Sequence, residues 1–172
     1  QLEFNPNAVK AYRLIGYENR KLAARDFNDD KKDAGELGAG HSITALYELI
    51  PAGSKEKIDG IDELKYQKLS PTAASLGDEL LTLKLRYKAP NGKKSKLIQR
   101  TVVNATNKKP SQDFRFAAAV AEFGMLLRDS KHKGNASYAH VIREATKASG
   151  KDPEGYRAEF LGLVKKAQLL SK

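Results

Sequence analysis

The chain has 172 residues, of which 40% are hydrophobic and 30% charged, a composition typical of a globular protein rather than a disordered one. This length corresponds to one domain or two small ones and is sufficient to bury a core. The absence of cysteine excludes disulfides, cysteine-ligated zinc, iron–sulfur clusters and a cysteine nucleophile. The net charge of +10 raises the question of an acidic partner.

The first 110 residues are predicted to be mainly β. In the segment 79–87, leucines and a tyrosine alternate with polar residues, which is the period-2 pattern of a half-buried strand. The Asn91-Gly92 pair that follows predicts a hairpin. The predicted strands are 12–19, 42–50, 64–69, 79–87 and 97–103. Residues 5–9 and 21–25 are predicted to form brief helical turns.

The last 62 residues are predicted to form three amphipathic helices. Ser111 or Asp113 can cap a helix that runs to about residue 130, and a second helix covers about 136–148. Asp152-Pro153-Glu154 is a strong helix start, because Asp caps free N–H groups and Pro suits the first turn. The predicted apolar faces are Phe116, Val120, Phe123, Met125, Leu126 and Leu127, then Tyr138, Val141, Ile142 and Ala145, and then Tyr156, Phe160, Leu163, Val164 and Ala167.

These patterns predict an α+β fold, with an antiparallel β-sheet or sandwich-like layer followed by a three-helix C-terminal region. The predicted domains are a mainly β region, 1–110, which we interpret as an incomplete sandwich, and a three-helix region, 111–172. Linker-type residues at 104–112 mark the boundary.

An acidic loop at 26–33 is the candidate metal site. Asp26, Asn28 and Asp30 match the first three ligand positions of an EF-hand-like calcium loop. The match then fails, because Lys31 stands where Gly is needed and Leu37 where a bidentate Glu is needed. The alternative is a polar turn whose side chains bind nearby backbone N–H groups. The candidate calcium ligands are Asp26, Asn28, Asp30 and Asp33.

The same region contains a candidate interaction loop. Three glycines lie between residues 35 and 40, but no Gly-Lys-Ser/Thr helix start follows them, so a phosphate loop is not indicated. We interpret the glycines as a tight turn that leads into a strand. Exposed loops carry binding residues more often than other segments do. The candidate interaction residues are Asp29, Glu36 and His41.

Lys93, Lys94 and Lys96 form the densest basic stretch and are the candidate residues for binding a polyanion. They follow the predicted hairpin turn, so the alternative is a solvated hairpin tip. No aromatic residue lies between Tyr87 and Phe114 to stack on bases. Nucleic acid is therefore not expected as a partner.

Catalytic and membrane signatures are absent from the sequence. The three histidines do not form a two-histidine metal motif, and no nucleophile elbow is present. We therefore do not expect an enzyme or a resident cofactor. No run of 18 apolar residues predicts a transmembrane segment. Because the chain starts at Gln1, we expect a fragment or a processed product.

Several blocks of sequence resemble the hallmarks of one bacterial family. The blocks are Phe4-Asn5-Pro6, Tyr12-Arg13-Leu14-Ile15-Gly16-Tyr17-Glu18-Asn19-Arg20, Asp26-Phe27-Asn28-Asp29-Asp30, Asp33-Ala34-Gly35-Glu36, Gly38-Ala39-Gly40-His41, Thr44-Ala45-Leu46-Tyr47-Glu48 and Asp152-Pro153-Glu154-Gly155-Tyr156-Arg157-Ala158-Glu159-Phe160. They resemble the carboxy-terminal domain of unknown function that follows a von Willebrand factor type A domain in bacterial proteins. The resemblance covers nearly the whole chain.

The resemblance implies a non-enzymatic structural or protein-interaction domain of a larger cell-envelope protein, periplasmic or extracellular. The implied partners are an upstream type A domain of the same polypeptide and an unidentified protein ligand. The Asp-x-Ser-x-Ser metal loop of type A domains does not occur in this chain. Strands from outside the chain are hypothesised to complete the sandwich, and an exposed sheet edge would allow a homo-oligomer.

Overall fold

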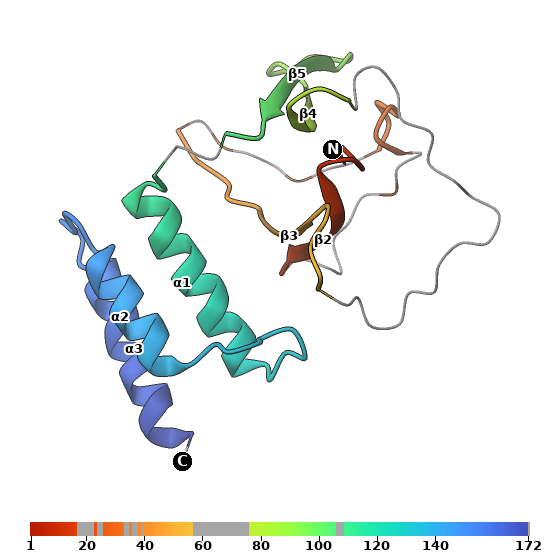
Figure 1. Cartoon of the computed structure of the whole chain (residues 1–172). Helices are drawn as coiled ribbons and strands as arrows, with labels where there is room; N and C mark the ends of the chain where they lie inside the picture. The colour runs from red at the N-terminus through yellow and green to blue at the C-terminus, as the bar shows by residue number, and fades with distance from the viewer. Residues whose placement is uncertain are drawn as a thin grey trace. The chain divides into compact units, whose positions relative to one another are not determined.

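The computed structural model describes residues 1–16, 23, 26–32, 35, 38, 40–56, 76–105 and 109–171. The chain divides into two compact units, Gln1–Thr106 and Asn107–Lys172. The first contains the strands and the second contains the three helices (Figure 1). An α+β fold with antiparallel sheets followed by three helices is therefore confirmed.

The first unit contains a three-stranded antiparallel sheet, sheet A, with strand order β1-β4-β5. Its strands are β1 Leu2–Phe4, β4 Glu79–Tyr87 and β5 Lys96–Val103. The predicted hairpin is present: β4 pairs with β5 along its length, from Glu79 opposite Val103 to Tyr87 opposite Lys96. Asn91 lies in the connecting loop with φ 59°, a left-handed conformation that Asn tolerates better than most residues.

A two-stranded antiparallel sheet, sheet B, joins β2 Val9–Ile15 to β3 Leu46–Pro51. The register pairs Tyr12 with Leu49 and Leu14 with Tyr47, so these four side chains share one face. The Phe4 ring of β1 lies 4.3 Å from the Tyr12 ring and 5.7 Å from the Tyr47 ring, measured between centroids. The ring contacts therefore bring Phe4 of sheet A next to this face of sheet B, although Tyr12 itself is 57% exposed.

Asn5 holds the turn between β1 and β2. Its amide group donates to the Glu79 carbonyl at 2.7 Å, and its Oδ1 accepts the backbone N–H of Asn7 at 3.0 Å. Its backbone N–H also donates to the Leu80 carbonyl at 2.9 Å. Asn5 is the buried polar residue among the described residues, and its side chain ties the turn to the start of β4.

Two strand boundaries differ from the prediction, and β1 was not predicted. Residues 41–45 do not form a strand, and β3 starts only at Leu46, because the pairing with β2 ends at Ile15 opposite Leu46. Residues 6–8 form a turn, consistent with the expected local turn, and β2 then starts at Val9 rather than at residue 12. The predicted strand 64–69 and part of the turn at 21–25 lie outside the described residues.

The second unit contains α1 Gln112–Leu127, α2 Tyr138–Lys147 and α3 Tyr156–Leu170. Its core consists of Ala119, Val141, Ala145 and Val164, with Phe116, Phe123, Leu126, Tyr138, Ile142, Phe160 and Leu161 packed against them. The Phe160 ring makes edge-on contacts with Phe116 at 5.3 Å and with Phe123 at 5.5 Å. These contacts join α3 to α1.

The predicted helix faces are partly wrong. Val120, Leu127, Tyr156 and Leu163 were expected to be buried, but all four are exposed. Ala119 occupies the buried position of α1 instead, and it packs in the core with Val141, Ala145 and Val164. The predicted burial of Val141, Ala145 and Val164 is confirmed.

Helix α3 begins later than predicted. Asp152 does not serve as the N-cap; Gly155, with φ 74°, takes this position and makes no side-chain cap bond. Asp152 still accepts the backbone N–H of Ala158 at 2.9 Å, so its carboxylate satisfies a first-turn donor from three residues before the cap. The predicted Ser111 cap of α1 is confirmed by its bond to the Phe114 N–H at 3.1 Å.

None of the helices in the described part of the chain combines the length and the apolar character required to cross a membrane.

Candidate functional site

The acidic loop lies against the β4–β5 hairpin. Asn28 Oδ1 accepts Arg86 Nε at 3.1 Å, and the Asp30 backbone carbonyl accepts Lys88 Nζ at 2.5 Å. The Asp30 carboxylate accepts the Ser95 backbone N–H at 3.3 Å. Arg86 also lies over the Phe27 ring, 5.6 Å from its centroid. The loop is therefore attached to the hairpin by the hairpin's own cations and backbone.

These contacts change the electrostatics of the candidate calcium site. Hydrogen bonds from Ser95, followed by the charges of Lys88 and Arg86, hold the pKa of Asp30 below its usual value. Of the proposed ligands, Asn28 and Asp30 have oxygens bonded to the hairpin, and Asp33 lies outside the described residues. Within the described ranges, no three His, Asp or Glu residues group to hold a metal ion. Calcium binding stays a prediction.

Of the three candidate interaction residues, the structure describes Asp29 and His41, and an interaction through this loop stays a prediction. Asp29 Oδ1 accepts the backbone N–H of Lys31 at 2.9 Å, which closes the loop locally. His41 is exposed, and its backbone N–H bonds to the Gly38 carbonyl. Glu36 lies outside the described residues.

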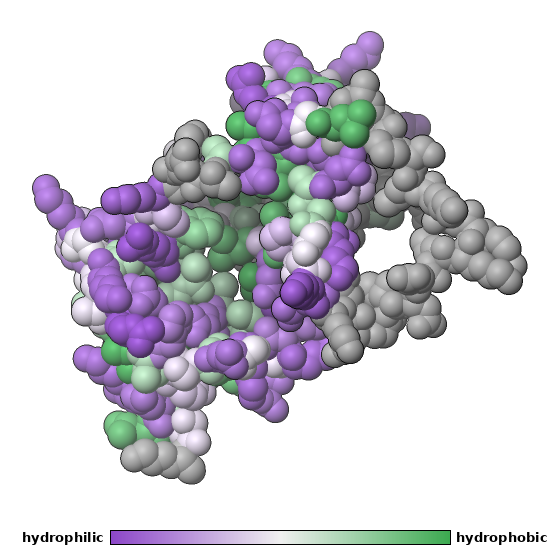
Figure 2. All heavy atoms as spheres, viewed as in Figure 1, coloured by the Kyte–Doolittle hydropathy of each residue, from purple (hydrophilic) through white to green (hydrophobic). Residues whose placement is uncertain are grey.

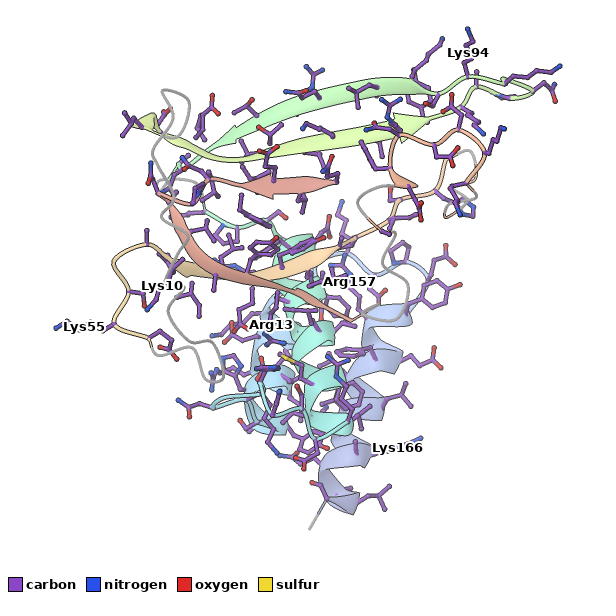
Figure 3. The ribbon with its side chains drawn as sticks, turned by 90° about the vertical axis from the view of Figure 1, so that its right-hand side faces the viewer. Lys10, Arg13, Lys55, Lys94, Arg157 and Lys166 are labelled. Carbon is purple, nitrogen blue, oxygen red and sulfur yellow. The ribbon has the colours of Figure 1, made fainter. Side chains whose placement is uncertain are left out.

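Lys93, Lys94 and Lys96 lie on and beside the hairpin tip and are exposed. Figure 3 shows Lys94 at the tip, pointing away from the ribbon. Across the residues that the structure describes, none of the three forms an ion pair. The arrangement fits the solvated hairpin tip, and polyanion binding by these lysines stays a prediction.

Sheet A also carries an apolar surface, whereas all the candidate sites predicted from the sequence are polar. Opposite residues of an antiparallel pair project to the same face, so the register places six large apolar side chains on one face of the hairpin, together with Arg100 opposite Leu83 and Lys96 opposite Tyr87. We call the apolar part of this face the apolar strip, and it consists of Leu81, Leu83, Leu85, Tyr87, Ile98 and Val102. Phe4, opposite Leu81, lies on the same face.

Most of the apolar strip is exposed, including Val102 at 41% and Tyr87 at 43%. Leu81, next to Phe4, is half-buried, whereas Leu83 is 39% exposed and Leu85 is 52% exposed. Ile98, opposite Leu85, is 41% exposed. Figure 2 shows hydrophobic atoms at the surface of the hairpin among hydrophilic ones. Leu81 is therefore the half-buried member of the strip, and the other five members are between 39% and 52% exposed.

The sequence contained the signal for this surface. The alternation in 79–87 predicts that one face of β4 is apolar and requires a cover. It does not show which residues cover each position, because sheet B comes from segments far away along the chain. The exposed part of the strip could be recognised only from the strand register.

Comparison with known proteins identifies the family. The profile described as "Uncharacterized protein YfbK, C-terminal" matches residues 1–170. The chain belongs to this family. It is 44% identical over 167 residues to "Uncharacterized protein YfbK" of Escherichia coli (strain K12), an alignment that covers 97% of this chain and 28% of the relative. The chain thus spans less than a third of the length of the curated relative it matches. No solved structure matches the chain.

Proposed function

We propose that the chain is a non-enzymatic structural domain that docks, through the apolar strip, onto another part of a longer bacterial polypeptide. The exposure of the strip is the observation that carries this proposal, since five large apolar side chains on one face of the hairpin are between 39% and 52% exposed and such clusters mark interaction sites. The relative extends well beyond the matched segment, and the family profile describes a C-terminal region. The occupant is accordingly the polypeptide outside the matched segment.

In this proposal the covering part includes the type A domain that the family resemblance implies, and the whole protein acts in the cell envelope. Fractionation of E. coli that produces the tagged relative tests the location. Recovery in the periplasmic or membrane fraction supports the envelope assignment, whereas recovery in the cytosol alone refutes it.

The docking surface is tested with two matched lysine substitutions. Leu85→Lys changes the apolar strip, and Leu97→Lys changes the opposite face of the same hairpin, where Leu97 is similarly exposed at 47%. Both are made in the isolated chain and in a chimera, in which this chain replaces the matched segment of the full-length relative. The readout is the free energy of unfolding of the segment, from protease susceptibility in urea.

Both substitutions should cost less than about 0.5 kcal/mol in the isolated chain, because both sites are exposed there. In the chimera, Leu85→Lys should cost about 2 kcal/mol more, because a charged side chain would replace a buried apolar one. Leu97→Lys should cost the same in both contexts. Equal effects of the two substitutions in the chimera would refute docking through the strip.

A further inference from the structure

Strand β1 pairs with only part of β4. β4 has nine residues and pairs with β5 along its length, but β1 pairs only with Leu81, Thr82 and Leu83. Beyond these pairs, Gln1 and Lys84 exchange two backbone hydrogen bonds of 2.8 Å each, so the ladder continues through Gln1. Among the described residues, nothing pairs with Leu85, Arg86 or Tyr87 on this side of β4.

We call this unpaired side of Leu85, Arg86 and Tyr87 the open edge of β4. The register between β1 and β4 defines which residues could pair with it. Gln1 and Lys84 form a hydrogen-bonded pair, and such pairs alternate along an antiparallel ladder. The next hydrogen-bonded pair would join Arg86 to the second residue before Gln1. The first and third residues before Gln1 would lie opposite Leu85 and Tyr87, on the face of the apolar strip.

We propose that residues directly before Gln1, in longer polypeptides of this family, extend β1 along β4 as far as Tyr87 and cover the Leu85 end of the apolar strip. The occupant is argued from the ladder and from the relative, which is much longer than the segment it shares with this chain. The inference rests on the proposed function, because it names the first segment of the rest of the polypeptide that reaches the strip. Main-chain pairing at an open edge supplies affinity, and alternate side chains supply specificity.

The experiment adds four residues before Gln1 of this chain. Thr-Val-Thr-Val places valines opposite Leu85 and Tyr87, whereas Val-Thr-Val-Thr has the same composition and places threonines there. Gly-Ser-Gly-Ser is the control without strand propensity. The readout is amide hydrogen exchange at Arg86, whose N–H points to the open edge. The Leu85 amide, which points to β5, is the internal reference.

Thr-Val-Thr-Val should slow exchange at Arg86 by at least about tenfold relative to Gly-Ser-Gly-Ser and leave Leu85 unchanged. It should also give a higher Tm than Val-Thr-Val-Thr. Equal exchange at Arg86 in all three proteins would overturn the inference, as would a higher Tm for Val-Thr-Val-Thr. Protection of Arg86 in the unextended chain that grows with protein concentration would assign the edge to a second copy and overturn it too.

The two proposals fail differently. If Arg86 gains no protection from the extensions but Leu85→Lys destabilises the chimera, the strip is covered by another segment and only this inference is lost. If Arg86 gains protection but Leu85→Lys has no specific effect in the chimera, the strand extension is retained and docking through the strip is lost.

Discussion

At the scale of single residues, Arg157 connects all three helices of the second unit. Its guanidinium donates to the Ala148 and Ser149 carbonyls at 2.8 and 3.2 Å and to the Asp113 carboxylate at 2.5 Å. It also lies over the Phe116 ring, 4.8 Å from the centroid. One planar group on α3 thus satisfies two carbonyls directly after α2 and a carboxylate on α1, a role that Lys cannot fill.

Arg157→Lys is therefore predicted to destabilise the second unit by about 2 kcal/mol, because one ammonium cannot replace the fork of donors. Urea unfolding followed by helical circular dichroism measures the change. Arg143→Lys is the matched control on α2, where Glu144 at the surface is the partner of the guanidinium among the described residues. Equal losses for the two substitutions would contradict the linking role of Arg157.

Asn5 links elements of the first unit, as Arg157 links the helices of the second. Asn5→Asp keeps the shape and the acceptor for the Asn7 N–H but removes the amide donor to the Glu79 carbonyl. The expected loss is about 2 kcal/mol, since the carboxylate would meet a carbonyl oxygen in a buried place. Gln99→Glu, which adds the same charge at an exposed position of β5, should change the stability by less than about 0.5 kcal/mol. A loss for Asn5→Asp no larger than for Gln99→Glu would argue against the role of Asn5.

The contacts of the acidic loop argue against the candidate calcium site, so we expect calcium to leave the Tm of the chain unchanged. Asn28 and Asp30 are bonded to the hairpin, and the cations Arg86 and Lys88 beside them oppose the approach of a metal ion. Thermal melts with calcium chloride and with chelator measure the effect. A rise in Tm that the chelator reverses, and that Asp30→Asn abolishes, would show a calcium site in this loop.

At the scale of elements, the free amine that the isolated chain carries at Gln1 couples its sheet A to pH. The folded state lowers the pKa of the Gln1 amine below 8.0, so the unfolded chain binds more protons in the interval just below that value. Stability should therefore rise as pH increases through this interval. N-terminal acetylation removes the charge and keeps the N–H donor to Lys84.

Acetylation is predicted to stabilise the chain at about pH 6 and to have little effect at about pH 9. Urea unfolding of both forms at the two pH values measures this difference. The same stabilisation at both pH values would contradict the assignment to the amine charge, and no stabilisation at either would contradict the burial of the amine.

Elements defined by local sequence could be predicted. The Ser111 cap sets the start of α1 through one bond three residues away, and alternation defines β4. β1 could not be predicted, because it has three residues and exists through pairing with β4, about eighty positions away. The start of α3 was misplaced because Asp152 caps the helix across a turn rather than from the adjacent position.

Besides the bounds of the elements, the sequence predictions also failed on which helix residues are buried. α1 is apolar on more than one side, so its sequence alone did not distinguish Ala119, which is buried, from Val120, which is exposed. In α2 the apolar residues occupy a single face, and Val141 and Ala145 were identified correctly. Periodicity predicts a buried face only where the opposite face is polar.

At the scale of the whole molecule, the chain forms two units that differ in how fully they bury their apolar side chains. The second unit closes its own core around Val141 and Val164. The first unit pairs a three-stranded sheet with a two-stranded one and leaves part of sheet A without a facing layer among the described residues. Two- and three-stranded sheets depend on such layers for their stability. This imbalance is the physical basis for placing the chain within a longer polypeptide.

The central claim is that the rest of the polypeptide covers the apolar strip. Amide hydrogen exchange of residues 79–103, measured in the isolated chain and in the chimera with the full-length relative, tests it most directly. We predict that exchange in the Leu85–Tyr87 end of the hairpin slows by at least about tenfold in the chimera, while α2 exchanges equally in both. Identical exchange of the hairpin in the two proteins would contradict the claim.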